Sequence, residues 1–204
     1  MPALRKDIDP EGLLEFSVVY TDRALNHMSV QFQQVMKDLS FELKSLFQAD
    51  ALAIVPGSGT AGMEAVARAL ATDQDAVIIR NGWFSYRWTQ ILEAIGVAKS
   101  SHVFKACLQE GKNGKFVPAD ITEVTTYIKE HRPGVVFAPH VETASGMMLS
   151  DDYIRALAEA VHLVGGLLVI DCIASGCIWL DMKALGIDVL LSAPQKGLSS
   201  TPCA

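Results

Sequence analysis

Two charged side chains that directly follow apolar runs could do chemistry together. Lys196 lies in the segment SAPQKG at 192–197, just after the run Val189–Leu191, and Asp171 follows the run at 167–170. We expect both runs to be buried strands. Burial at a strand end disfavours the ammonium form of a lysine, which leaves its amine free to attack an aldehyde. A buried carboxylate needs a cationic or hydrogen-bonding partner, so we predict a covalent ligand held by both side chains. For each residue alone, a solvated lysine or a structural carboxylate is the alternative.

A glycine-rich loop, PGSGTAG at 56–62, lies between an apolar run at 51–55 and a helical pattern. Its glycines let backbone N–H groups turn inward, and the start of a helix adds partial positive charge, which together suit a phosphate. Ser58 and Thr60 add hydroxyl donors. The same letters fit the G-x-G-x-x-G dinucleotide fingerprint, with Arg80 at the end of the next run where NADP would need a basic residue. From this segment alone, a phosphate site, an NADP loop and a simple turn all remain open.

Two more segments follow predicted strands and carry side chains suited to ligands. The first, NGWFSYRW at 81–88, holds four aromatic residues that could cover a planar ring, although core packing is the alternative for most of them. Its Arg87 could bind a substrate anion or form a structural ion pair. The second, HVETASG at 140–146, supplies hydroxyls and a carboxylate. Because ligands bind outside the carboxyl ends of parallel strands, we expect these segments to gather around one site.

The elements that must position these segments alternate between strand and helix. Continuous apolar runs, typical of strands buried on both faces, predict strands at 51–55, 76–80, 135–138, 167–170 and 189–191. Helical spacing predicts an amphipathic helix at 30–49 and further helices at 61–70, 86–95, 121–130 and 152–162. This alternation predicts an α/β domain with a mainly parallel sheet over residues 50–204, preceded by an N-terminal segment, 1–49, that contains the amphipathic helix.

Composition limits the classes of function. The chain has 204 residues, of which 50% are hydrophobic, so it can bury a sizeable core. Its formal net charge of −6 argues against nucleic acid as a partner, because phosphate backbones are met by basic surfaces. No run approaches the roughly 20 apolar residues of a membrane span, and the N-terminus lacks an apolar signal core, so we predict a cytoplasmic protein without membrane contact. The four cysteines form no C-x-x-C pair, which predicts reduced, buried thiols and no metal site.

Taken together and in this order, the segments resemble the class V aminotransferase family of fold-type I pyridoxal-phosphate enzymes. The shared motifs are Ser-Gly-Thr in the glycine loop, an aromatic residue after Asn-Gly, His-x-Glu-Thr, an aspartate after an apolar strand, and Gln-Lys-Gly. They span about residues 50 to 202, and Asp171 and Gln195-Lys196 are their most specific parts. The resemblance implies the large domain of this fold, a three-layer sandwich around a mainly parallel sheet, with the family's C-terminal domain missing.

The resemblance also implies which residues hold the cofactor, pyridoxal 5'-phosphate. Lys196 would bind its aldehyde as a Schiff base, and Asp171 would pair with its pyridinium nitrogen, which makes the ring an electron sink. The other contacts follow the same motifs: Ser58, Gly59, Thr60 and Gln195 at the phosphate, Phe84 and Ile173 at the ring faces, and Thr143 beside the ring hydroxyl.

The function that the resemblance implies is transamination dependent on pyridoxal phosphate. An amino group would pass from a small amino acid or an aminophosphonate to a 2-oxo acid such as pyruvate or glyoxylate, by a ping-pong mechanism in which Lys196 also moves the proton at the donor Cα. Related cysteine desulfurases carry a histidine before the lysine, so Gln195 favours transamination. Arg87 is a candidate contact for a substrate anion, and the family's homodimers share their active sites between subunits.

Two alternatives stay open. An NADP-dependent oxidoreductase would use the loop from Gly57 to Gly62 as its dinucleotide site, and a truncated, non-catalytic homologue would serve binding or dimerisation. If the chain ends at Ala204, we expect no turnover from it alone, because the family's substrate-carboxylate arginine belongs to the C-terminal domain.

Overall fold

The chain forms two compact units that divide between Leu52 and Ala53. The computed structural model describes residues 28–110 and 114–200, so residues 1–27 of the predicted N-terminal segment lie outside it. Among the described residues, no helix is both long enough and apolar enough to cross a bilayer.

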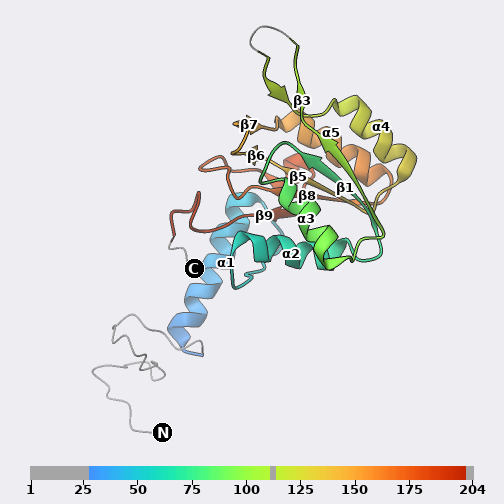
Figure 1. Cartoon of the computed structure of the whole chain (residues 1–204). Coiled ribbons are helices and arrows are strands. Elements are labelled where there is room, and N and C mark those ends of the chain that lie inside the picture. Colours follow the sequence, from blue (N-terminus) through green and yellow to red (C-terminus); the bar gives the residue numbers. More distant parts are fainter. Residues whose placement is uncertain (1–27, 111–113, 201–204) are drawn as a thin grey trace, which may run out of the picture. The chain divides into compact units, whose positions relative to one another are not determined.

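The first unit contains one described helix, α1 (Val30–Phe47). It begins where the Ser29 hydroxyl accepts a hydrogen bond from Phe32 N at 3.0 Å, which satisfies one of the free N–H groups of the first turn. It ends at Gln48, which adopts the left-handed conformation that commonly closes a helix. The helix predicted at 30–49 is confirmed (Figure 1).

The second unit is built on a five-stranded sheet with the order β2-β1-β5-β8-β9 (Figure 1). All four pairings are parallel, so the carboxyl ends of the five strands lie at one edge. Four of the five strands correspond to predicted ones. The strands are β1 (Asp75–Arg80), β2 (Ser100–Lys105), β5 (Val135–Pro139), β8 (Leu167–Asp171) and β9 (Val189–Leu191).

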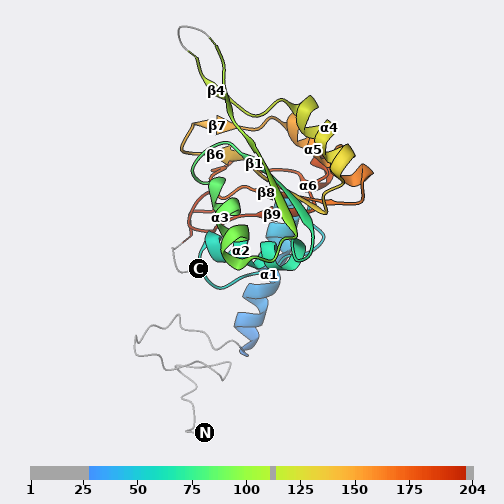
Figure 2. The ribbon, with the colours of Figure 1, turned by 45° about the vertical axis from the view of Figure 1, so that its right-hand side comes forward.

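Helices cover both faces of this sheet and complete the predicted three-layer α/β sandwich (Figure 1, Figure 2). On one face, α2 (Gly59–Leu70) packs beside α3 (Tyr86–Ile95). On the other face, α4 (Ile121–His131) packs beside α5 (Asp151–Leu163). The short α6 (Met182–Leu185) leads into β9. All four helices predicted for this unit are present.

Side chains alternate along each strand, so the sheet contributes to two layers of core. Ile78 and Phe137 point toward α2 and α3, where the Phe137 ring stacks on the Trp88 indole with centroids 4.3 Å apart. Their neighbours Val77 and Val136 point to the opposite face and are also fully buried. Burial on both faces explains why these strands are continuous apolar runs in the sequence.

Two hairpins and one edge strand are not predicted by the sequence pattern. β3 (Cys107–Leu108) pairs with β4 (Phe116–Val117), and β6 (Val141–Glu142) pairs with β7 (Met147–Met148), both antiparallel. These strands are too short to show a period. The edge strand β2 reads SSHVFK and buries only Phe104, so it lacks the apolar continuity of the central strands.

The strand predicted at 51–55 is wrong. Ile54 and Val55 are exposed, and the segment pairs with none of the described strands. An apolar run becomes a strand only where a neighbouring strand satisfies its backbone groups, and this segment has no such neighbour. The glycine-rich loop therefore follows an extended segment instead of a strand.

The prediction of buried cysteines holds for only one of the described thiols. Cys172 is buried, whereas Cys107 and Cys177 are exposed, and all three are free. Cys203 lies outside the described residues.

Candidate active site

Asp171 is the last residue of β8 and is only 8% exposed at the carboxyl edge of the sheet. Its Oδ1 accepts a hydrogen bond from Ile173 N at 2.9 Å. Burial raises the pKa of this carboxyl to about 6, the Ile173 N–H lowers it in part, and the Glu142 carboxylate raises it further. A cationic neighbour would restore the charged form, because an opposite charge offsets the loss of hydration.

Glu142 is fully buried and joins the two loops that follow β1 and β5. Its carboxylate accepts hydrogen bonds from Phe84 N at 3.1 Å and from Ser85 N at 2.8 Å. It also accepts from the Ser85 hydroxyl at 2.6 Å and from Ala144 N at 3.2 Å. Gly82 packs against it so closely that an added Cβ would lie 2.7 Å from Glu142 Cγ. This carboxylate fixes the position of the aromatic loop that carries Phe84.

Replacing Glu142 by alanine is expected to destabilise the folded protein by about 3 kcal/mol or more. The change leaves the N–H groups of Phe84, Ser85 and Ala144 without their acceptor, and it leaves the buried Ser85 hydroxyl only the Gly82 carbonyl at 3.3 Å. Urea unfolding followed by circular dichroism measures the difference. Glu130→Ala on the exposed side of α4 is the matched control and should change stability by less than about 0.5 kcal/mol. An equal effect of both substitutions would contradict the role of Glu142.

The glycine-rich loop leads into α2, whose first turn keeps N–H donors that no helix carbonyl accepts. Gly57, with φ 137°, makes a turn that favours glycine, and Ser58 Oγ accepts from Ala61 N at 3.4 Å. The other N–H groups of the first turn have no partner within the helix. Arg87 Nη1 donates to Thr60 Oγ1 at 3.0 Å, and its Nε is buried without a partner among the described residues. A helix N-terminus with a guanidinium beside it can hold an anion.

Gly59 brings the glycine-rich loop against the segments that follow β8 and β9. A Cβ added at Gly59 would lie 2.6 Å from Ile173 Cδ1 and 3.6 Å from Ala193 Cβ. Ile173 comes two residues after Asp171, and Ala193 comes three residues before Lys196. The predicted phosphate loop, the buried acid and the lysine-bearing segment therefore lie side by side.

Lys196 lies in a turn after β9, and its side chain is exposed, so its predicted burial is wrong. Lys196 N donates to Ala193 O at 3.1 Å, and the turn carries the side chain away from the buried strand into solvent. The next residue, Gly197, packs directly against the backbone of Gly176. Any side chain at position 197 would collide with the Gly176 carbonyl oxygen. Gln195 is half-buried beside it.

His140 ties the segment after β5 to the segment after β8. Its backbone N donates to Asp171 O at 2.8 Å, and its ring Nδ1 lies 2.7 Å from Ser175 Oγ. Burial lowers the pKa of His140, which favours the neutral imidazole, and the charge of Asp151 acts in the opposite direction. Sequence reasoning placed His140 in a motif without giving it a role, because only the fold shows that its ring is turned inward.

The remaining predicted contacts are accessible to a ligand. Phe84 is 50% exposed, and Ser58 and Thr143 are also exposed. Phe84 and Thr143 lie on the two loops that Glu142 joins.

The geometry does not support the NADP alternative. A dinucleotide fingerprint needs a strand immediately before its glycine loop, and residues 51–55 form none. Arg80, which would have met the extra phosphate of NADP, instead lies over the Tyr86 ring with its guanidinium carbon 4.9 Å from the centroid.

Known proteins share this fold and its motifs. The family described as aminotransferase class-V matches residues 14–201. The L-aspartate–glyoxylate aminotransferase of Paracoccus denitrificans is 33% identical over 73% of this chain and 36% of its own length. The alanine–glyoxylate aminotransferase of Rattus norvegicus is 28% identical over 88% of the chain and 42% of its own length.

Two solved structures extend the likeness to the fold. The alanine–glyoxylate aminotransferase of Nostoc has a TM-score of 0.72 at 26% identity, over 87% of this chain and 45% of its own. The ureidoglycine–glyoxylate aminotransferase of Bacillus subtilis has a TM-score of 0.68 at 27% identity, over 84% and 42%. The chain thus spans less than half the length of the relatives it matches.

The fold is that of fold-type I aminotransferases, and the match covers most of the described residues. The chain belongs to the class-V aminotransferase family. The cofactor of this family is pyridoxal phosphate.

The residues of this site fit that cofactor. The α2 N-terminus and Arg87 supply positive charge for a phosphate, and the buried Asp171 carboxyl suits a protonated ring nitrogen. Phe84 is exposed and can cover a planar ring, and the exposed Lys196 amine can reach an aldehyde.

Proposed function

We propose that the protein is an aminotransferase that uses glyoxylate as amino acceptor and a small amino acid as donor. The donor leaves as its 2-oxo acid, and glyoxylate leaves as glycine, so atoms and charge balance over the two half-reactions. The names of the relatives above give glyoxylate as one substrate. The same names give aspartate, alanine or ureidoglycine as the other. Pyruvate as acceptor and an aminophosphonate as donor stay predictions.

The observation that carries this proposal is the packing of three segments around one edge of the sheet. Gly59 of the glycine-rich loop contacts the segment after Asp171 and the segment before Lys196. No simple structural reason brings a phosphate-type loop, a buried acid and an accessible lysine together, whereas pyridoxal phosphate requires all three.

In this proposal the chain's own residues have distinct tasks. Ser58, Gly59 and Thr60 hold the cofactor phosphate with help from Gln195, and Arg87 adds charge through its bond to Thr60. Pyridoxal phosphate supplies an electron sink when bound. Asp171 keeps the ring nitrogen protonated, and the Lys196 amine binds the aldehyde and moves the proton at the donor Cα. The remaining contacts are aromatic or apolar at the ring faces and a hydroxyl at its edge: Phe84, Ile173 and Thr143.

The proposal also includes the extent of the cofactor-binding domain and the oligomeric state of the protein. Residues 50–204 form the cofactor-binding large domain, and the active protein is a homodimer. The contact of Arg87 with Thr60 places it at the phosphate side of the site, and its role toward a substrate anion stays a prediction.

Amino transfer to glyoxylate can be followed with a ¹⁵N label on the amino group of the donor. The full-length protein, loaded with pyridoxal phosphate, is mixed with glyoxylate and one of ¹⁵N-labelled alanine, serine or aspartate, and ¹⁵N-glycine is measured by mass spectrometry. We expect labelled glycine from at least one donor, at a rate at least tenfold above a reaction without protein.

A separate readout keeps cofactor binding apart from substrate choice. Borohydride reduction followed by peptide mapping should place the cofactor on Lys196. An adduct on Lys196 without any labelled glycine would refute glyoxylate as acceptor, and no adduct at all would refute the proposed function as a whole.

A further inference from the structure

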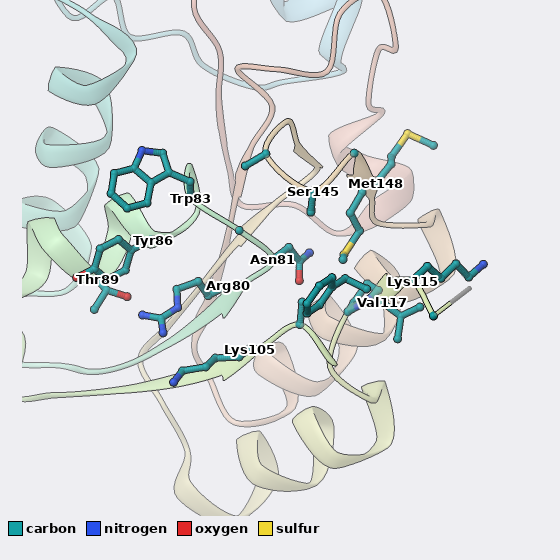
Figure 3. A pocket seen from close by; sticks show the side chains of 18 of the residues that line it. Arg80, Asn81, Trp83, Tyr86, Thr89, Lys105, Lys115, Val117, Ser145 and Met148 are labelled. Atoms are coloured by element: carbon teal, nitrogen blue, oxygen red, sulfur yellow. The ribbon is translucent and has the colours of Figure 1, made fainter. Parts of the chain in front are cut away.

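A cavity of about 1220 Å³ opens at the carboxyl ends of β1 and β2 (Figure 3). Its walls come from the end of β1 and the aromatic loop, the first turns of α3, the end of β2, β4 and the β6–β7 hairpin. None of the residues proposed to contact pyridoxal phosphate lines it. Its lining is therefore distinct from the candidate active site, although both belong to the same unit.

Two cations lie side by side in this cavity. Arg80 and Lys105 are register partners at the ends of β1 and β2, so their side chains leave the sheet on the same face. Figure 3 shows both extending in the same direction. Neither forms an ion pair with any described residue, and the cavity's one carboxylate, that of the exposed Glu93, pairs with neither. Adjacent positive charges repel each other, and an anion bound between them offsets this repulsion.

Two buried polar atoms of residues that line this cavity lack hydrogen-bond partners among the described residues. Thr89 Oγ1 and Asn81 Oδ1 form no hydrogen bond with the described residues, although these residues are only 5% and 3% exposed and line the cavity. Buried polar groups without partners are rare in proteins, because each one destabilises the folded state unless something satisfies it. The threonine hydroxyl can donate to an anionic oxygen, and the asparagine oxygen can accept from a hydroxyl on the ligand.

We propose that this cavity is a second anion site, which binds a small organic acid or phosphate ester. The phosphate or carboxylate lies between Arg80 and Lys105 and accepts from Thr89. A hydroxyl of the ligand donates to Asn81, and its apolar body lies along the exposed Trp83, whose ring is 5.8 Å from that of Tyr86. Arg80 is already oriented by its contact with the Tyr86 ring, so its guanidinium edge remains available for the anion.

Isothermal titration calorimetry tests this site with inorganic phosphate and, in a second arm, with succinate. The protein is loaded with pyridoxal phosphate, so that the phosphate cradle of the active site is filled. Arg80→Gln/Lys105→Gln should weaken phosphate binding at least tenfold, and Thr89→Val should weaken it about threefold. The control Lys99→Gln/Lys129→Gln removes the same charge from residues outside the cavity and should change the affinity less than twofold. The two arms show whether the site prefers a phosphate or a carboxylate.

A third variant separates this site from the active site. Ser58→Ala alters the cofactor cradle and should leave phosphate affinity within twofold of the unaltered protein. The proposal is overturned if Ser58→Ala weakens phosphate binding as much as the cavity variants do, or if the Arg80/Lys105 variant binds like the control. If circular dichroism shows that the double variant is unfolded, unchanged binding by Thr89→Val overturns it instead. Because no readout depends on transamination, failure of this inference leaves the proposed function untouched.

Discussion

Replacing Lys196 by alanine is expected to lower the rate of transamination by about a thousandfold or more. In the proposed function this amine both binds the cofactor aldehyde and moves the proton at the donor Cα, and no other described lysine lies in the segments that Gly59 brings together. The rate of ¹⁵N-glycine formation from labelled alanine measures the loss. The folded structure should be unaffected, because the Lys196 side chain is exposed and forms no hydrogen bond with the part of the chain that the structure describes.

Two comparisons make the Lys196 result specific. Lys129→Ala removes another exposed lysine, from α4, and should keep the full rate. Lys196→Arg keeps the positive charge but cannot form a Schiff base, so it should lose activity like the alanine variant. Borohydride reduction should add the mass of the cofactor to the unaltered protein and to Lys129→Ala only. Activity retained in Lys196→Arg would assign the chemistry to another residue.

Replacing Asp171 by asparagine is expected to have opposite effects on stability and on function. Burial raises the pKa of Asp171 from its ordinary 3.8 to about 6, so the folded protein binds this proton more tightly than the unfolded chain. Between these values the contribution of Asp171 to stability falls as pH rises, and above pH 6 the buried charge is fully unfavourable. Without cofactor, Asp171→Asn should therefore be more stable than the unaltered protein at pH 7.5, by on the order of 2–3 kcal/mol.

With cofactor the order reverses. The charged Asp171 gains a cationic partner in the ring nitrogen, which asparagine cannot replace, so we expect transamination to fall by about a hundredfold or more. Thermal unfolding from pH 4 to 8, with and without pyridoxal phosphate, measures both effects. Asp152→Asn changes a fully solvated carboxylate and serves as the control. If Asp171→Asn lowers stability at pH 7.5 in the absence of cofactor, the raised pKa is not a property of the folded protein.

The central strands could be predicted from sequence because burial on both faces leaves a clear signal. β1, β5, β8 and β9 are runs of apolar residues, and their order in the chain implied the parallel sheet. The same apolar signal led to the wrong prediction of a strand at 51–55. Ile54 and Val55 are apolar, but they are exposed and their segment pairs with none of the described strands. β2 gave no signal, because an edge strand with one solvated side can be largely polar.

The candidate site was predictable only as far as residue types and order suffice. Asp171 ends an apolar run, and such a position is buried almost by necessity. Lys196 is different: the turn after β9 decides whether its side chain enters the protein, and sequence spacing does not determine that turn. Glu142 was part of a motif, yet its role depends on the meeting of two loops about 60 residues apart in the chain, which only the fold reveals.

The strand order has a consequence for the way space is divided at the carboxyl edge. Starting at β1, the chain first adds β2 on one side and later adds β5, β8 and β9 on the other, so the direction of winding reverses between β1 and β5. At such a switch point the loops diverge and a crevice normally receives the ligand. Here the Glu142 carboxylate occupies that crevice and bonds the loops across it. The middle of the crevice is thus closed by a buried side chain, with the segments after β8 and β9 on one side of it and the cavity at the ends of β1 and β2 on the other.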